Sequence, residues 1–168
     1  MKKAVLVLAV ALLAVAMLAT PIVNATPSEP VSGTQILTGF TPLGASPKGK
    51  SDNVVTAATV EVTWAGDIAG STSYEGILMI HNFVPPTGMG PDTTVNIHER
   101  IFFPTATVLG KSGSLTMEVN ANLARGKDVF RWTILSGTGE LTNLHGNGIY
   151  YLVEGPLYAY EGQVHFDP

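Results

Sequence analysis

The sequence predicts an all-β protein, an antiparallel barrel of about eight strands, from three observations. Apolar and polar residues alternate with period two over most of the chain beyond residue 53, which is typical of strands with one buried and one hydrated face. Clusters of Gly, Pro and Asp separate these segments at short intervals. Connections this short favour antiparallel pairing, because parallel neighbours need long crossovers.

The N-terminal segment, residues 1–25, has the layout of a secretory signal peptide. Lys2 and Lys3 precede an apolar run over 4–19, and small or apolar residues, Val23 and Ala25, stand where a signal peptidase reads the chain. We expect cleavage after Ala25 and a secreted or extracytoplasmic protein with no membrane contact after cleavage. An uncleaved N-terminal anchor is the alternative.

Residues 26–50 are rich in Pro, Ser and Gly, and we interpret them as a tether with a candidate first strand at 34–40. The barrel domain is expected over 51–168. Its strands are predicted at 54–65, 72–82, 94–104, 113–121, 128–135, 147–153 and 157–166. The alternating positions that define them include Val60, Val62 and Trp64; Glu75, Ile77, Met79 and His81; Val95, Ile97, Ile101 and Phe103; Leu115, Met117 and Val119; Phe130, Trp132 and Ile134; and Tyr158, Tyr160, Val164 and Phe166.

Eight such strands close into a barrel that has no exposed edges, with an interior that side chains fill or that holds one small ligand. A β-sandwich is the alternative architecture, because the alternation is the same in both. In either case Trp132 is predicted to lie in the core, in phase with Phe130 and Ile134.

Composition excludes several classes of function. The chain has 9 Lys and Arg against 13 Asp and Glu, so it lacks the basic surplus of a nucleic-acid-binding protein. It has no Cys, which excludes disulfides and thiolate chemistry. Its 4 His residues are not spaced as metal ligands, so we expect no metal and no cofactor.

Glycine-rich motifs in the C-terminal half carry a family resemblance. Residues 109–115 read LGKSGSL, residues 132–141 read WTILSGTGEL and residues 144–148 read LHGNG. This order resembles the bacterial domain-of-unknown-function 3224 family, whose members look like the allene oxide cyclase barrels. The resemblance covers roughly residues 54–166 and implies a barrel and a homo-oligomer, but no particular activity. Leu141 and Leu144, within these motifs, are expected to plug one end of the barrel.

Two carboxylates share a strand face with apolar residues. Glu99 is in phase with Ile97 and Ile101, and Glu75 is in phase with Ile77. We expect at least one of them to point into an enclosed pocket, held by a Tyr hydroxyl or an Arg, where loss of water raises its pKa. A structural hydrogen-bonding role is the alternative for both.

Aromatic residues and one histidine complete the set of candidate ligand-binding residues, namely Trp132, Tyr74 and His81 beside Glu99 and Glu75. Aromatic side chains either line a cup for a ligand or form the core. The sequence therefore predicts an exported barrel that binds a small apolar or aromatic molecule or serves as a structural module. The alternative is an isomerase or cyclase of the allene oxide cyclase type with a buried carboxylate. A filled interior would exclude both ligand binding and this alternative.

Overall fold

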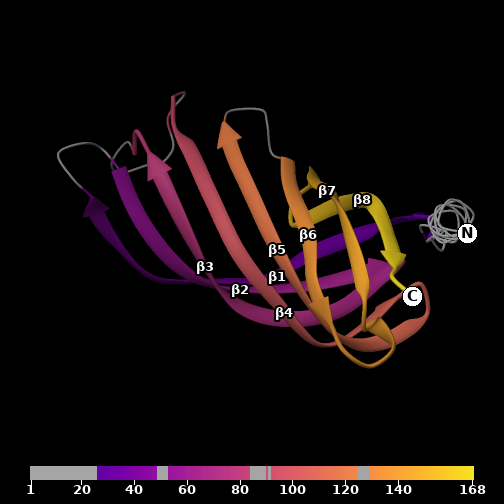
Figure 1. Cartoon of the computed structure of the whole chain (residues 1–168). Coiled ribbons are helices and arrows are strands. Elements are labelled where there is room, and N and C mark those ends of the chain that lie inside the picture. The colour runs from indigo at the N-terminus through magenta and orange to yellow at the C-terminus, as the bar shows by residue number, and fades with distance from the viewer. Residues whose placement is uncertain (1–25, 49–52, 84–89, 91, 125–128) are drawn as a thin grey trace, which may run out of the picture.

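The chain forms a closed antiparallel barrel in which eight strands pair in sequence order (Figure 1). The structure is a computed structural model that describes residues 26–48, 53–83, 90, 92–124 and 129–168. The predicted all-β, eight-stranded antiparallel barrel is confirmed, and the β-sandwich alternative is excluded by the pairing of β1 with β8. The expected signal peptide, residues 1–25, lies outside the described residues.

The strands are long for a small barrel. Their bounds are β1 Glu29–Lys48, β2 Asn53–Gly66, β3 Ile68–His81, β4 Thr94–Val108, β5 Lys111–Ala124, β6 Val129–Gly137, β7 Leu144–Glu154 and β8 Leu157–Phe166, with a short 3-10 helix, η1, at Gly139–Leu141. All strands predicted after residue 53 are present. Several strands begin or end a few residues beyond the predicted limits, because the connections between strands are short. Asp67 alone separates β2 from β3.

The first strand corrects the predicted tether. Residues 29–48 form β1, which pairs with β8 up to Ile36 and with β2 up to Lys48. Pro42 lies where β1 has only β2 beside it, next to a register shift, and proline is tolerated at such edges and bulges. The predicted strand 34–40 is thus the middle of a 20-residue strand, and the barrel begins well before residue 51.

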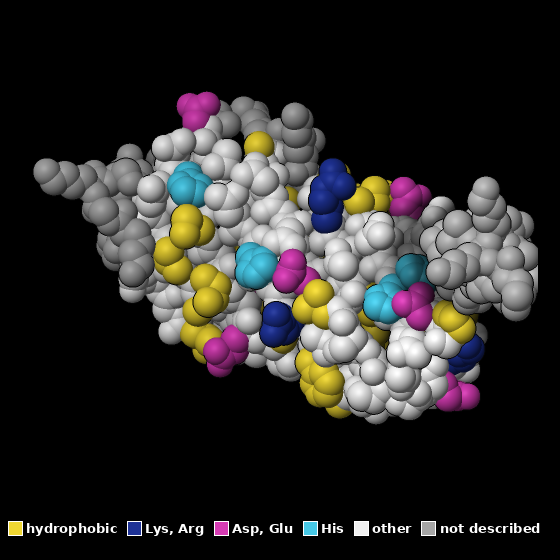
Figure 2. All heavy atoms as spheres, viewed as in Figure 1, with side chains coloured by type: hydrophobic (Ala, Val, Ile, Leu, Met, Phe, Trp, Pro, Cys, Tyr) yellow, Lys and Arg dark blue, Asp and Glu magenta, His cyan; other side chains and the backbone are white. Residues whose placement is uncertain are grey.

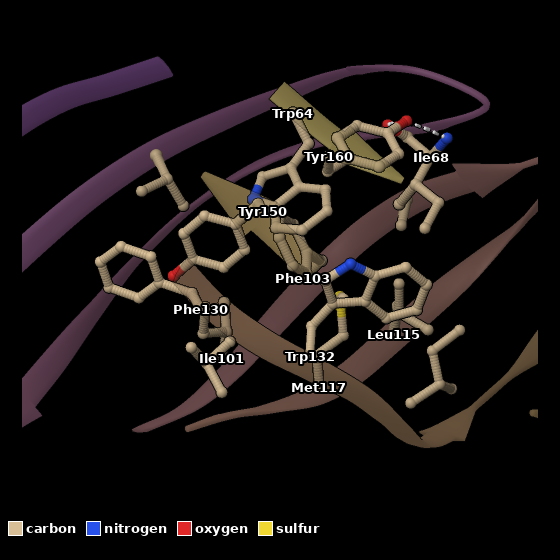
Figure 3. Packing of buried hydrophobic residues seen from close by; sticks show 14 of the residues in the cluster. Trp64, Ile68, Ile101, Phe103, Leu115, Met117, Phe130, Trp132, Tyr150 and Tyr160 are labelled. Carbon is tan, nitrogen blue, oxygen red and sulfur yellow. Dashed lines mark hydrogen bonds between the residues drawn. The ribbon is translucent and has the colours of Figure 1, made fainter. Parts of the chain in front are cut away.

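One end of the barrel is closed by side chains. Trp64 contacts Phe103, Trp132 and Tyr150 edge to face, with ring centroids 5.8–6.5 Å apart (Figure 3). Trp132 has no exposed surface, which confirms its predicted place in the core. Leu141 of η1 and Leu144 are also fully buried, as expected for an end plug.

The other end of the barrel is open. Strands β1–β5 extend past β6–β8 and flare away from the closed end as a curved sheet (Figure 1). The pairing of β1 with β8 stops at Ile36 and that of β5 with β6 stops at Ala121, so the sheet is no longer closed beyond these residues. We call this extension of β1–β5 the lip. On the exterior face seen in Figure 2, charged side chains are few and separated, consistent with 13% charged residues in the sequence.

Candidate functional site

A cavity of about 100 Å³ lies at the barrel mouth, between the packed core and the lip. Strands β1, β2, β3, β4, β6, β7 and β8 all contribute to its wall. The lining residues are Gln35, Leu37, Phe40, Val60, Tyr74, Leu78, Ile97, Glu99, Phe130, Tyr150 and Tyr158. The barrel interior is therefore filled at one end and hollow at the other.

Glu99 is the carboxylate inside the barrel. It lies on the inner face of β4 between Ile97 and Ile101, and 7% of its surface is exposed. The Tyr74 hydroxyl donates a hydrogen bond of 2.9 Å to Glu99 Oε2. Burial raises the pKa of the Glu99 carboxyl above its ordinary value of 4.5, and the bond from Tyr74 offsets part of the rise. The expectation that a Tyr hydroxyl holds a buried carboxylate is confirmed for this residue.

A break in the β-sheet makes room for this carboxyl group. The β3–β4 ladder changes register between Gly70 and Leu78, and such irregularities re-aim side chains. Within the break, Glu99 Oε1 occupies the space that a Cβ atom on residue 76 would fill. A side chain at position 76 would therefore displace the carboxyl group of Glu99, which Gly76 leaves in place.

Gln35 is a second buried polar group at the cavity, and sequence reasoning missed it. Its side chain on β1 is 5% exposed, and its Oε1 atom has no hydrogen-bond partner. A buried carbonyl oxygen without a partner costs about 1–3 kcal/mol. Trp64 Nε1, on the residue that pairs with Gln35 across β1 and β2, is likewise buried without a partner. Gln35 is in phase with Val31 and Leu37, so it shares a strand face with apolar residues, which is the pattern that identified Glu99.

Aromatic rings form one side of the cavity. Phe130 and Tyr150 stack with centroids 4.4 Å apart, and Tyr158 meets both rings edge-on at 5.7 Å. Burial raises the pKa of the Tyr74 and Tyr150 hydroxyls, with the nearby Glu99 charge adding to the effect, so both phenols stay protonated at neutral pH. Tyr74, Tyr150 and Tyr158 line the cavity together with Phe130.

Three of the predicted ligand-binding residues lie elsewhere. Glu75 is exposed, because the inner face of β3 is that of Tyr74, Gly76 and Leu78. His81 shares the outer phase of Glu75 and hydrogen-bonds to Asn53 and Asn96. Trp132 lies in the core and does not line the cavity. Of the predicted set, the structure brings together Tyr74 and Glu99 alone.

Wider and more open grooves lie on the outside of the barrel. A wide, open groove outside the barrel is lined by residues including Asn96, Asn122 and Arg131, whose surroundings are solvent-exposed. Within residues 26–48, 53–83, 90, 92–124 and 129–168, no group of three or more His, Asp or Glu side chains is arranged to hold a metal ion. No helix in these ranges is long and apolar enough to cross a membrane.

Comparisons with known proteins agree with this architecture. No curated protein matches the chain. A crystal structure of a protein of unknown function from the DUF3224 family of Shewanella oneidensis MR-1 superposes with a TM-score of 0.65 at 18% identity, covering 84% of this chain and 99% of that one. The family described as "Protein of unknown function (DUF3224)" matches residues 38–161. The chain therefore belongs to the DUF3224 family of β-barrel proteins of unknown function.

Proposed function

We propose that this protein is an exported barrel that binds a small molecule with an apolar body in the cavity at the barrel mouth. The observation that carries the proposal is Gln35 Oε1, a buried acceptor without a partner in the wall of a cavity that also holds the buried Glu99. Ligand sites commonly combine an apolar wall with a few converging polar groups.

The size of the cavity favours binding over the isomerase or cyclase alternative. A space of about 100 Å³ is below the 300–1,000 Å³ of sites that enclose a drug-sized molecule. It accepts the head of a ligand whose remainder lies in the mouth, where Phe40 is 51% exposed. A cyclase has to surround and fold its substrate, whereas a binding protein has only to hold one end. Similarity to the allene oxide cyclases is a prediction from the sequence.

Native mass spectrometry of protein purified from its own host tests the proposal. We expect a non-covalent adduct on the wild-type protein that is lost or reduced in the Gln35→Leu variant. Gln163→Leu, at an exposed position on β8, is the matched control and should keep the adduct. An adduct-free barrel whose thermal midpoint is unmoved by a library of small aromatic compounds would overturn the proposal. The same spectra show whether the protein is a homo-oligomer.

A further inference from the structure

We propose that the ligand carries an amine, and that its ammonium head enters the cavity between Glu99 and Gln35. This inference rests on the proposed function and specifies its ligand class. The hydrogen-bonding capacity of the cavity, its charge, its aromatic wall and its volume each bear on the choice.

The hydrogen-bonding groups of the cavity call for a donor. Gln35 Oε1 is an acceptor with no partner, and the Glu99 carboxylate accepts a bond from Tyr74 while retaining further acceptor capacity. An ammonium group has three donors and no acceptor, so it satisfies both residues at once. A hydroxyl group has one donor, which leaves either Gln35 or Glu99 without a bond. A carboxylate offers acceptors only and satisfies neither.

The charge of the cavity has the sign that selects a cation. Glu99 is the one carboxylic acid among the described lining residues, and none of those residues is Lys or Arg. An anionic ligand would meet a like charge in a site of low dielectric, which costs more than at the surface. A cationic ligand instead supplies Glu99 with the counter-ion that a buried carboxylate needs.

The aromatic wall also suits a cation. Phe130, Tyr150 and Tyr158 border the same cavity as Glu99, with ring centroids 4.4–5.7 Å from one another. Phe130 and Tyr150 stack on each other, which leaves one face of each ring for another neighbour. A ring face attracts an ammonium group through the ring quadrupole, more strongly when water is excluded. Aromatic rings combined with one carboxylate are therefore suited to a protonated amine with a hydrocarbon body.

The cavity volume limits how much of the ligand enters. A cavity of about 100 Å³ is smaller than the engineered cavity of about 150 Å³ that holds benzene. The ammonium group and its first carbon atoms fill it, and a larger apolar body rests against Leu37, Phe40 and Leu78 at the start of the lip. These three side chains are partly or largely exposed, so a ligand would remove apolar surface from water.

Isothermal titration with benzylamine, benzyl alcohol and benzoate tests the inference, because the three share one ring and differ in the head group. We expect benzylamine to bind at least about tenfold more tightly than benzyl alcohol, with benzoate weakest. Glu99→Gln should remove the preference for the amine, and Gln35→Leu should weaken both benzylamine and benzyl alcohol. Glu75→Gln removes the same charge from the outside of β3 and should change nothing.

The outcomes separate this inference from the proposed function. Equal or tighter binding of benzyl alcohol or benzoate, sensitive to Gln35→Leu, overturns the amine and leaves the binding site in place. An amine preference that survives Glu99→Gln also overturns it. If none of the three compounds binds the wild-type protein, the amine is overturned, and the native mass spectrum decides separately whether the proposed site stands. Circular dichroism of each variant verifies that the barrel is folded.

Discussion

Tyr74 on β3 and Glu99 on β4 meet inside the barrel, where the phenol donates a 2.9 Å hydrogen bond to the carboxylate. The two residues lie where the backbone ladder between their strands is interrupted, so the side chains connect the strands across the break. The carboxyl group is held there with its pKa raised by burial. This pair gives an apolar cavity a defined charge, which bears on both stability and recognition.

The pH dependence of folding should report the buried carboxyl group. Burial favours the neutral form of Glu99, so the pKa of its carboxyl group is higher in the folded than in the unfolded protein. The free energy of unfolding is therefore highest below the unfolded-state pKa and falls as pH rises through the folded-state pKa. In urea unfolding between about pH 4 and pH 8, Glu99→Gln should therefore gain stability relative to wild type as pH rises. Glu75→Gln is the control, and a Glu99→Gln difference that is constant with pH would contradict the burial of the charge.

The Tyr160 hydroxyl group should stabilise the turn between β2 and β3. Its hydroxyl accepts a 2.7 Å hydrogen bond from the Ile68 N–H and donates one of 2.9 Å to the Ile68 carbonyl (Figure 3). Tyr160→Phe leaves both backbone groups buried without that partner, so we expect a loss of about 1–3 kcal/mol in the free energy of unfolding. Tyr151→Phe, on the exposed side of β7, should be neutral in the same urea titrations. Equal free energies of unfolding of the two variants would show that the Tyr160 hydroxyl does not stabilise the turn.

Trp132 should be among the most costly residues to remove. Its ring is fully buried, donates a 3.2 Å hydrogen bond to the Ile149 carbonyl and packs against Gly148 and Gly162. Trp132→Ala is expected to lose about 3–5 kcal/mol, the usual range for emptying a large aromatic site. A loss below about 1 kcal/mol, measured by chemical denaturation, would show that the closed end of the barrel is not packed around this ring.

The mature chain should begin at Thr26. The prediction rests on the two lysines at positions 2 and 3, the apolar run and Val23-Asn24-Ala25. N-terminal sequencing of protein from the extracytoplasmic fraction checks it. Membrane-bound protein with an intact Met1 would instead identify an uncleaved anchor.

The sequence predicts the barrel well because alternation is physically tied to burial in a closed sheet. For β1 it predicts residues 34–40 alone, because the prolines and glycines on either side are normally breakers, and the pairing with β2 and β8 shows that the strand runs from Glu29 to Lys48. That pairing is long-range and leaves no local signal.

Prediction of the site succeeds for Glu99 and fails for Glu75 for a physical reason. Over residues 94–101 of β4 apolar and polar residues alternate, so the phase of Glu99 identifies the interior. Over residues 77–80 of β3 the sequence is Ile-Leu-Met-Ile, apolar on both faces, and alternation there cannot say which face is inside. The exposure of Ile77 and Met79 shows that the outer face of this strand is apolar, and Glu75 follows them outward.

The most direct test of the account is the titration of the Glu99 side-chain carboxyl by carbon-13 NMR, with and without saturating benzylamine. We expect a midpoint above 4.5 in the free protein, because the group is desolvated at the cavity wall, and a lower midpoint with the amine bound, because an ammonium favours the carboxylate. A carboxyl group that titrates at its ordinary value and is unmoved by the amine would contradict it.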